Sequence, residues 1–231
     1  MLALACSTAP AERVAILDSI ERGDGDGPLL VMLHGYGSRP EDLASFADRS
    51  DLPRGTRMSF PRAPEAVHPP LGLEGRSMWW RFTDDLSDLR GVRLPGLPAA
   101  RERVRAFLDD RQARLGIASD RIVLGGFSQG AILALDVALH DDRPLAGIAL
   151  LSATLVDEAE VIARVRTRRG LPTYVSHGTR DTVLPYERTL DLVARLREGG
   201  LDVRFTTFDG GHEVTDVVSS ELAAFVGDVT R

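Results

Sequence analysis

The segment Arg121-Ile-Val-Leu-Gly125-Gly126-Phe127-Ser128-Gln129-Gly130 carries the strongest structural signal in the chain, and it continues into Ala131-Ile-Leu-Ala. Its first half is an apolar run typical of a buried strand, and its last five residues match the pattern G-x-S-x-G. Between a strand and a helix this pattern is typical of a nucleophile elbow. Glycines two residues away on either side leave room for the strained turn that exposes the serine. We therefore predict Ser128 as a nucleophile, and the alternative is a serine that only caps the following helix.

Short apolar runs alternate with segments of helical period along the rest of the chain. We expect strands at 13–20, 28–33, 57–60, 121–125, 145–151, 172–176 and 202–208, and helices at 98–115, 128–139, 185–198 and 213–226. This alternation predicts an α/β fold with a mostly parallel central sheet and helices on both faces. We predict one domain over 1–231, with about the first twelve residues disordered and a lid-like, proline-rich loop over 61–98.

Composition excludes several classes of function. The net charge of −6 over 231 residues argues against a nucleic-acid partner. All 28 basic residues are arginine, so the lysine chemistry of Schiff bases and P-loops is excluded. Cys6 is the only cysteine, which rules out an intramolecular disulfide and a cysteine-rich metal site.

The same sequence features bear on location and cofactors. The longest apolar runs are far too short to span a membrane. The first six residues weakly resemble the end of a lipoprotein signal but lack a basic segment. We expect a cytoplasmic protein without metal or cofactor.

A serine nucleophile needs a base and a group that orients the base. His212 follows the last predicted strand, in a loop at the carboxyl edge of the sheet, where open α/β sheets bind their ligands. The other histidines have simpler explanations: His34 and His177 sit in turns after strands, His68 lies in the proline-rich loop, and His140 is a solvated helix end.

Asp181 is the predicted acid because it lies in the loop after the strand at 172–176 and reaches the same edge. The order Ser128, Asp181, His212 along the chain is the order of α/β-hydrolases. Asp209 is the rival acid, but its position three residues before the histidine favours a role in the turn. A neutral histidine base predicts activity that rises with pH through about 6 to 7.

Negative charge that develops on a substrate oxygen needs fixed hydrogen-bond donors. The elbow supplies the backbone N–H of Gln129. We assign the second donor to the N–H of Tyr36, within His34-Gly35-Tyr36-Gly37, where glycines allow close approach. The alternative is that this segment is only a tight exit from the preceding strand.

Four segments together resemble the phospholipase/carboxylesterase family of α/β-hydrolases, which includes bacterial carboxylesterases and acyl-protein thioesterases. They are Leu33-His-Gly-Tyr-Gly-Ser38, Gly125-Gly-Phe-Ser-Gln-Gly130, His177-Gly-Thr-Arg-Asp181 with Val183 and Pro185, and Gly210-Gly-His-Glu-Val214. The resemblance runs from about residue 28 to the C-terminus. It implies cofactor-free hydrolysis of short- to medium-chain acyl esters or thioesters, and often a homodimer.

Trp79 and Trp80 are similar to an aromatic segment near the acyl pocket of this family, which implies a role in substrate binding. Two bulky aromatic residues in a loop can equally pack that loop onto the core. Two further functions stay open: a peptidase or C–C hydrolase on the same scaffold, and a catalytically silent hydrolase that serves as a ligand sensor or scaffold.

Overall fold

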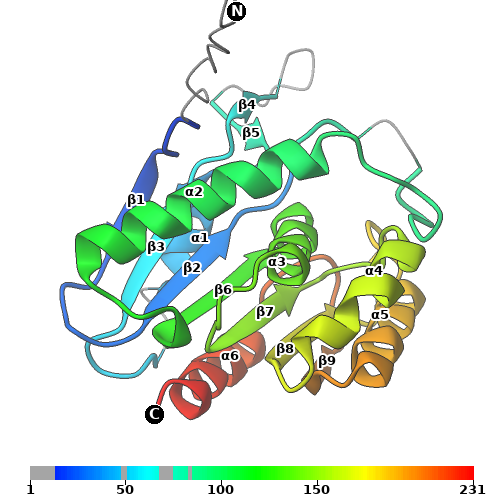
Figure 1. Cartoon of the computed structure of the whole chain (residues 1–231). Coiled ribbons are helices and arrows are strands. Elements are labelled where there is room, and N and C mark those ends of the chain that lie inside the picture. The colour runs from blue at the N-terminus through cyan, green and yellow to red at the C-terminus, as the bar shows by residue number, and fades with distance from the viewer. Residues whose placement is uncertain (1–13, 48–50, 68–74, 83–84) are drawn as a thin grey trace, which may run out of the picture.

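The structure, a computed structural model, describes residues 14–47, 51–67, 75–82 and 85–231. Its centre is a seven-stranded sheet in the order β1-β3-β2-β6-β7-β8-β9, with only β1 antiparallel to its neighbour (Figure 1). The strands are β1 (Ser19–Arg22), β2 (Leu29–Leu33), β3 (Arg57–Pro61), β6 (Ile122–Phe127), β7 (Gly147–Leu151), β8 (Pro172–Gly178) and β9 (Asp202–Phe208). A separate pair is formed by β4 (Glu65–Ala66) and β5 (Ser77–Met78). The predicted α/β fold with a mostly parallel sheet is confirmed.

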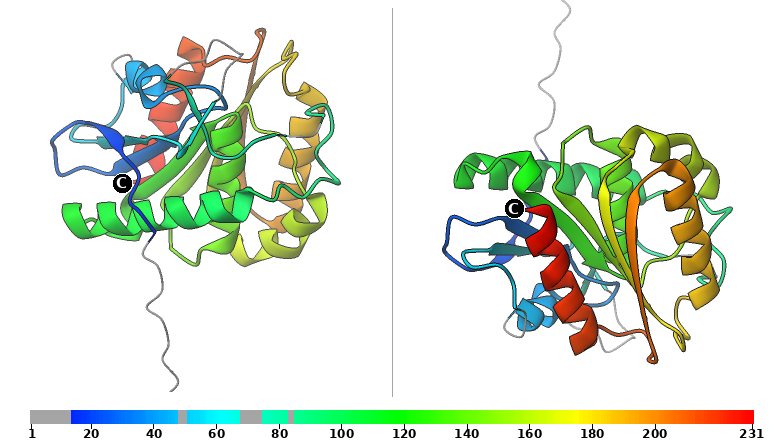
Figure 2. Two further views of the ribbon diagram at one scale, coloured as in Figure 1. Left: turned by 90° about the horizontal axis from the view of Figure 1, so that it is seen from above. Right: turned by 90° about the horizontal axis from the view of Figure 1, so that it is seen from below.

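Helices cover both faces of the sheet. They are α1 (Pro40–Ala47), α2 (Leu97–Leu115), α3 (Gln129–His140), α4 (Glu158–Arg164), α5 (Tyr186–Gly199) and α6 (Asp216–Val229), with short 3-10 helices at Ser119–Arg121 and Val165–Arg168. The view along the sheet shows α2 on one side and α1 with α6 on the other (Figure 2).

Strand β2 shows how one sequence fills two cores. Leu29, Val31 and Leu33 pack in the core that includes buried residues of α2, α3 and α5. Leu30 and Met32 point into the second core, with α1 and α6. Side chains alternate across a strand, so a continuous apolar run is the pattern that a strand buried on both faces requires.

Several predicted element bounds were wrong. The first strand was expected at 13–20, but β1 spans Ser19–Arg22 because its partner β3 offers only Arg57–Pro61 for pairing. Helices α1 and α4 were missed, since eight and seven residues are too few to show a helical period. The expected disorder of the first twelve residues lies outside the described part of the chain.

The strand order reverses between β2 and β6. The chain leaves β2 toward β3 and later returns to place β6 on the other side of β2. In open α/β sheets such a switch point leaves a crevice at the carboxyl ends of the strands, where ligands bind. Tyr36 follows β2 and Ser128 follows β6, so both lie at this point.

Candidate active site

Ser128 lies between the end of β6 and the start of α3, in the turn that the sequence predicted. Its backbone has φ of 54° and ψ of −118°, a conformation that non-glycine residues rarely adopt. The turn is held by hydrogen bonds from the Ser128 N–H to the Leu151 carbonyl (2.9 Å) and from the Ile132 N–H to the Ser128 carbonyl (3.1 Å). The surrounding strand and helix thus hold the strained serine in place.

The two glycines of the elbow are required by close backbone packing. A Cβ atom on Gly126 would lie 2.3 Å from the Gly130 carbonyl carbon, and one on Gly130 would lie 2.0 Å from the Leu33 carbonyl oxygen. The steric reason is therefore close contact of α3 with β6 and β2.

Asp181 and His212 meet across two loops. The Asp181 Oδ2 lies 2.6 Å from the His212 Nδ1, and the aspartate side chain is fully buried while the histidine is 16% exposed. The loops are packed together, since the Arg180 N–H donates to the Gly210 carbonyl at 2.9 Å. Asp209, the rival acid, is exposed and pairs with Arg180 at 2.9 Å.

The Asp181 carboxylate is fixed by its own turn. Its Oδ1 accepts hydrogen bonds from the backbone N–H groups of Val183 (2.8 Å) and Leu184 (2.9 Å). Burial alone would raise the Asp181 pKa, but hydrogen bonds from His177, His212 and the Leu184 N–H together hold that pKa far below its usual value. The carboxylate therefore stays ionised beside His212.

His177 supports this acid, a contact that the sequence did not reveal. Its Nε2 lies 3.2 Å from the Asp181 Oδ2 and 2.9 Å from the Leu184 carbonyl, and its Nδ1 lies 2.7 Å from the Thr189 hydroxyl. The ring is fully buried. Its role in the turn was predicted, and the spacing His177-x-x-x-Asp181 was the signal that could have indicated the contact.

His34 braces the loop that carries Tyr36. Its Nε2 accepts the Ala63 N–H at 3.1 Å, and its Nδ1 lies 2.8 Å from the Gly35 carbonyl. Burial lowers the pKa of His34 to about 4, so the ring is neutral. The Gly37 N–H donates to the Ser77 carbonyl at 3.0 Å, which ties the loop to β5.

The Gln129 side chain has a role that the sequence did not predict. It is fully buried, accepts the Trp79 N–H at its Oε1 (2.9 Å) and donates from its Nε2 to the Trp80 carbonyl (2.8 Å). Trp79 also donates from its indole Nε1 to the His34 carbonyl at 2.9 Å. The elbow thus anchors the segment after β5.

Trp79 and Trp80 are each 1% exposed and belong to the hydrophobic core. Neither lines the cavity beside Ser128, so the structure places them as the packing alternative describes. Phe82, two residues after Trp80, lines that cavity, and its ring contacts the Trp80 ring with centroids 5.5 Å apart.

A cavity of about 360 Å³ opens at Ser128 and His212. Its wall is mainly apolar and comes from five separate parts of the chain, one of which holds His212. Besides Ser128 and His212, the lining residues are Gly35, Tyr36, Ser38, Phe82, Leu86, Phe127, Ile132, Val183 and Leu184. Sequence patterns missed most of these residues because they come from segments that lie far apart in the sequence. The Phe127 ring also packs on His212, with centroids 4.7 Å apart.

The prediction for His140 was wrong. The His140 side chain is only 13% exposed, and it pairs through its Nε2 with the Glu160 Oε1 at 3.1 Å, so it is not a solvated helix end. His68 lies outside the described residues. Within the described ranges no group of three or more metal-ligating side chains comes together, and no described helix is long and apolar enough to cross a membrane.

Residues 18–228 match the sequence model of the Phospholipase/Carboxylesterase family. The chain belongs to the phospholipase/carboxylesterase family. This family member is 32% identical over 218 residues to acyl-protein thioesterase 1 of Mycosarcoma maydis, with 87% of this chain and 90% of that protein covered. It is 40% identical over 104 residues to acyl-protein thioesterase 1 of Neurospora crassa, with 42% and 41% covered.

Solved structures agree with this assignment. Esterase PE8 superposes with a TM-score of 0.81 at 27% identity, covering 93% of this chain and all of that one. The Bacillus cereus carboxylesterase superposes with a TM-score of 0.72 at 19% identity, covering 93% and 95%, which shows the shared fold. The resemblance seen in the four motifs is confirmed, and the phospholipase/carboxylesterase chain is a serine hydrolase of the carboxylesterase and thioesterase type.

Proposed function

We propose that the protein hydrolyses acyl esters or thioesters through Ser128, His212 and Asp181. The observation that carries the proposal is the 2.6 Å contact between the Asp181 Oδ2 and the His212 Nδ1, with His212 and Ser128 on the wall of one cavity. An ionised carboxylate at Nδ1 fixes the imidazole tautomer whose Nε2 can accept a proton.

The proposed reaction has two halves. The Ser128 Oγ attacks the acyl carbonyl carbon while the His212 Nε2 takes the hydroxyl proton, and the tetrahedral intermediate collapses as His212 gives that proton to the leaving alcohol or thiol. A water molecule, deprotonated by His212, then attacks the acyl-enzyme and releases the carboxylic acid. Ser128 regains its proton from His212 in the last step.

The backbone N–H groups of Gln129 and Tyr36 are the proposed donors to the oxyanion. The Gln129 N–H lies at the first position of α3, where an N–H has no acceptor within its own helix. The N-terminal end of the helix dipole also favours negative charge there. Tyr36 is supported by its place on the cavity wall and by the ties of its loop to Ala63 and Ser77.

The substrate we propose has a short- to medium-chain acyl group. Phe82, Leu86, Ile132 and Val183 give the cavity an apolar wall, and among the residues that the structure describes no arginine, aspartate or glutamate lines it. An apolar wall of this kind favours binding of a neutral alkyl chain over binding of a charged acyl group. The contribution of Phe82 and Leu86 also supports the proposed lid role of the loop at 61–98.

Two further proposals come from the family resemblance and from the cysteine content. A homodimer in solution would give twice the chain mass in light scattering, and a monomer mass would refute it. The second is a cytoplasmic location, which the single cysteine, Cys6, permits because no intramolecular disulfide is needed; cell fractionation tests it.

Ester turnover by matched serine variants tests the proposed function. We expect hydrolysis of p-nitrophenyl esters and acyl thioesters by the wild type, and a loss of at least about a thousandfold in kcat for Ser128→Ala. The control is Ser38→Ala, which removes another hydroxyl from the same cavity, one that donates to the Asp42 Oδ2 at 2.8 Å. Full activity in Ser128→Ala, or none in the wild type, refutes the proposal and favours the silent-hydrolase alternative.

A further inference from the structure

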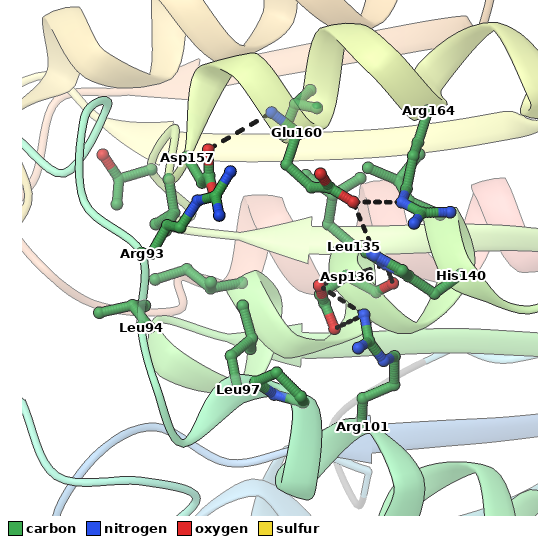
Figure 3. Close-up of a pocket in the computed structure, with 16 residues that line it drawn as sticks. Arg93, Leu94, Leu97, Arg101, Leu135, Asp136, His140, Asp157, Glu160 and Arg164 are labelled. Atoms are coloured by element: carbon green, nitrogen blue, oxygen red, sulfur yellow. Dashed lines mark hydrogen bonds and ion pairs between the residues drawn. The ribbon is translucent and has the colours of Figure 1, made fainter.

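A second cavity of about 320 Å³ lies beside the catalytic one and is lined by residues of α2, α3 and α4 and of the loops before α2 and α4 (Figure 3). Leu94, Leu97 and Leu135 form part of its apolar wall, together with Val156. In Figure 3, Leu94 and Leu97 lie on one side of the cavity, and His140 and Arg164 lie on the other. Charged residues lie on both sides, because Arg93 and Asp157, an ion pair at 3.3 Å, lie beside Leu94, so leucine side chains alternate with ion pairs along the wall.

The charged residues of the wall balance one another. Asp136 pairs with Arg101 at 3.3 Å, Glu160 pairs with Arg164, and His140 lies 3.1 Å from the Glu160 Oε1. These groups neutralise one another and leave no net charge that calls for an ionic ligand. The apolar side chains of the wall can hold an added ligand, and their chemistry suits an alkyl chain.

Ile132 is the residue that both cavities share. It lies one helical turn after Ser128 on α3, with its N–H bonded to the Ser128 carbonyl, and its side chain is 4% exposed. Residues four apart lie on the same face of a helix. Ile132, Leu135 and Leu139 therefore form one stripe of α3 that begins one turn after Ser128 and continues into the second cavity.

We propose that Ile132 sets the acyl-length limit of this enzyme, and that the second cavity is an extension of the acyl site that Ile132 closes. The proposal rests on the proposed ester hydrolysis. An acyl chain bound to Ser128 and directed along this stripe meets the Ile132 side chain. A smaller side chain at 132 joins the two cavities and lets a longer alkyl chain reach Leu135.

The test is the chain-length profile of kcat/KM for p-nitrophenyl esters of two to sixteen carbons. For Ile132→Ala and Ile132→Val we expect the preferred chain to lengthen, with each newly buried methylene raising kcat/KM about fourfold, the equivalent of about 0.8 kcal/mol. For Ile132→Phe we expect the preferred chain to shorten. The matched control is Leu139→Ala, which enlarges the second cavity two turns further along α3 without opening it to Ser128.

The outcomes separate the two proposals. A wild type that hydrolyses no ester refutes the proposed function, whereas an active wild type with unchanged profiles in folded Ile132→Ala and Ile132→Val overturns the role of Ile132. A profile that lengthens equally in Leu139→Ala also overturns it. If Ile132→Ala does not fold, opposite shifts in Ile132→Val and Ile132→Phe support the proposal, and shifts in one direction or none refute it.

Discussion

The buried Gln129 side chain joins the nucleophile elbow to the segment that holds both tryptophans, and its removal should release that segment. We choose Gln129→Met, which keeps the approximate length of the side chain and removes both hydrogen-bonding groups. The Trp79 N–H and the Trp80 carbonyl would then be left without partners, and both residues are 1% exposed. The backbone N–H proposed as an oxyanion donor is unchanged.

The magnitude follows from two unsatisfied groups. Each buried polar group without a partner costs about 1–3 kcal/mol, so the free energy of unfolding should fall by roughly 2–6 kcal/mol. For a chain of this length that lowers Tm by roughly 5–20 °C. The control is Gln112→Met on α2, whose amide donates to the half-buried Ser119 hydroxyl at 2.7 Å and should cost less than about 1 kcal/mol.

Tryptophan fluorescence reports directly on this region, because Trp79 and Trp80 are the only tryptophans in the chain. Urea unfolding followed by fluorescence and by far-UV circular dichroism gives the loss of stability and shows whether the segment detaches first. Unchanged emission together with a loss below about 1 kcal/mol in Gln129→Met would refute the reasoning.

Gln129→Glu adds a pH test of the same contact. The Trp80 carbonyl needs a donor, which a carboxylate lacks and a protonated carboxyl supplies. Burial raises the pKa of a carboxyl group, so this variant should become more stable relative to the wild type as the pH falls toward 5. A stability difference that is independent of pH would contradict the assigned donor.

Two other carboxyl groups give predictions. Asp181→Asn should lower kcat about ten-thousandfold, as expected when the orienting carboxylate is lost. Because the Asp181 pKa is depressed in the native state, the Asp181 carboxylate stabilises the fold above about pH 4. In acid titrations the stability of the wild type relative to Asp181→Asn should therefore decline below about pH 4. Burial raises the pKa of Asp136 to about 6 despite the nearby Arg101, so this carboxyl group binds its proton more tightly in the native state than in the unfolded state. The stability of the wild type relative to Asp136→Asn should therefore fall as the pH rises from about 4 to 6, and a rise over that range would contradict the assignment.

Local signals in the sequence predicted the fold and the principal candidate residues. Ser128 was found because its motif, strand and helix are contiguous, and the sheet was found because buried strands such as Leu29–Leu33 are continuously apolar. Asp181 and His212 were paired through the order of elements along the chain. Their 2.6 Å contact depends on the packing of two loops, which the sequence alone does not specify.

The remainder of the site depends on long-range packing. Phe82, Ile132 and Val183 come from three separate elements, and nothing in their local sequence marks them as neighbours of Ser128. The contacts of the Gln129 side chain were not predicted because the motif indicates a role only for the Gln129 backbone N–H. The buried ion pair of His140 was not predicted because its partner Glu160 lies twenty residues away. Such contacts appear only once the helices are placed on the sheet.

Covalent labelling with a fluorophosphonate probe tests most directly whether Ser128 is the activated nucleophile of this enzyme. After labelling and proteolysis, mass spectrometry should place the phosphonate on Ser128, with one label per chain and labelling slowed at least about a thousandfold in His212→Ala. Labelling of Ser38, which lines the same cavity, or of no serine at all, would contradict the account.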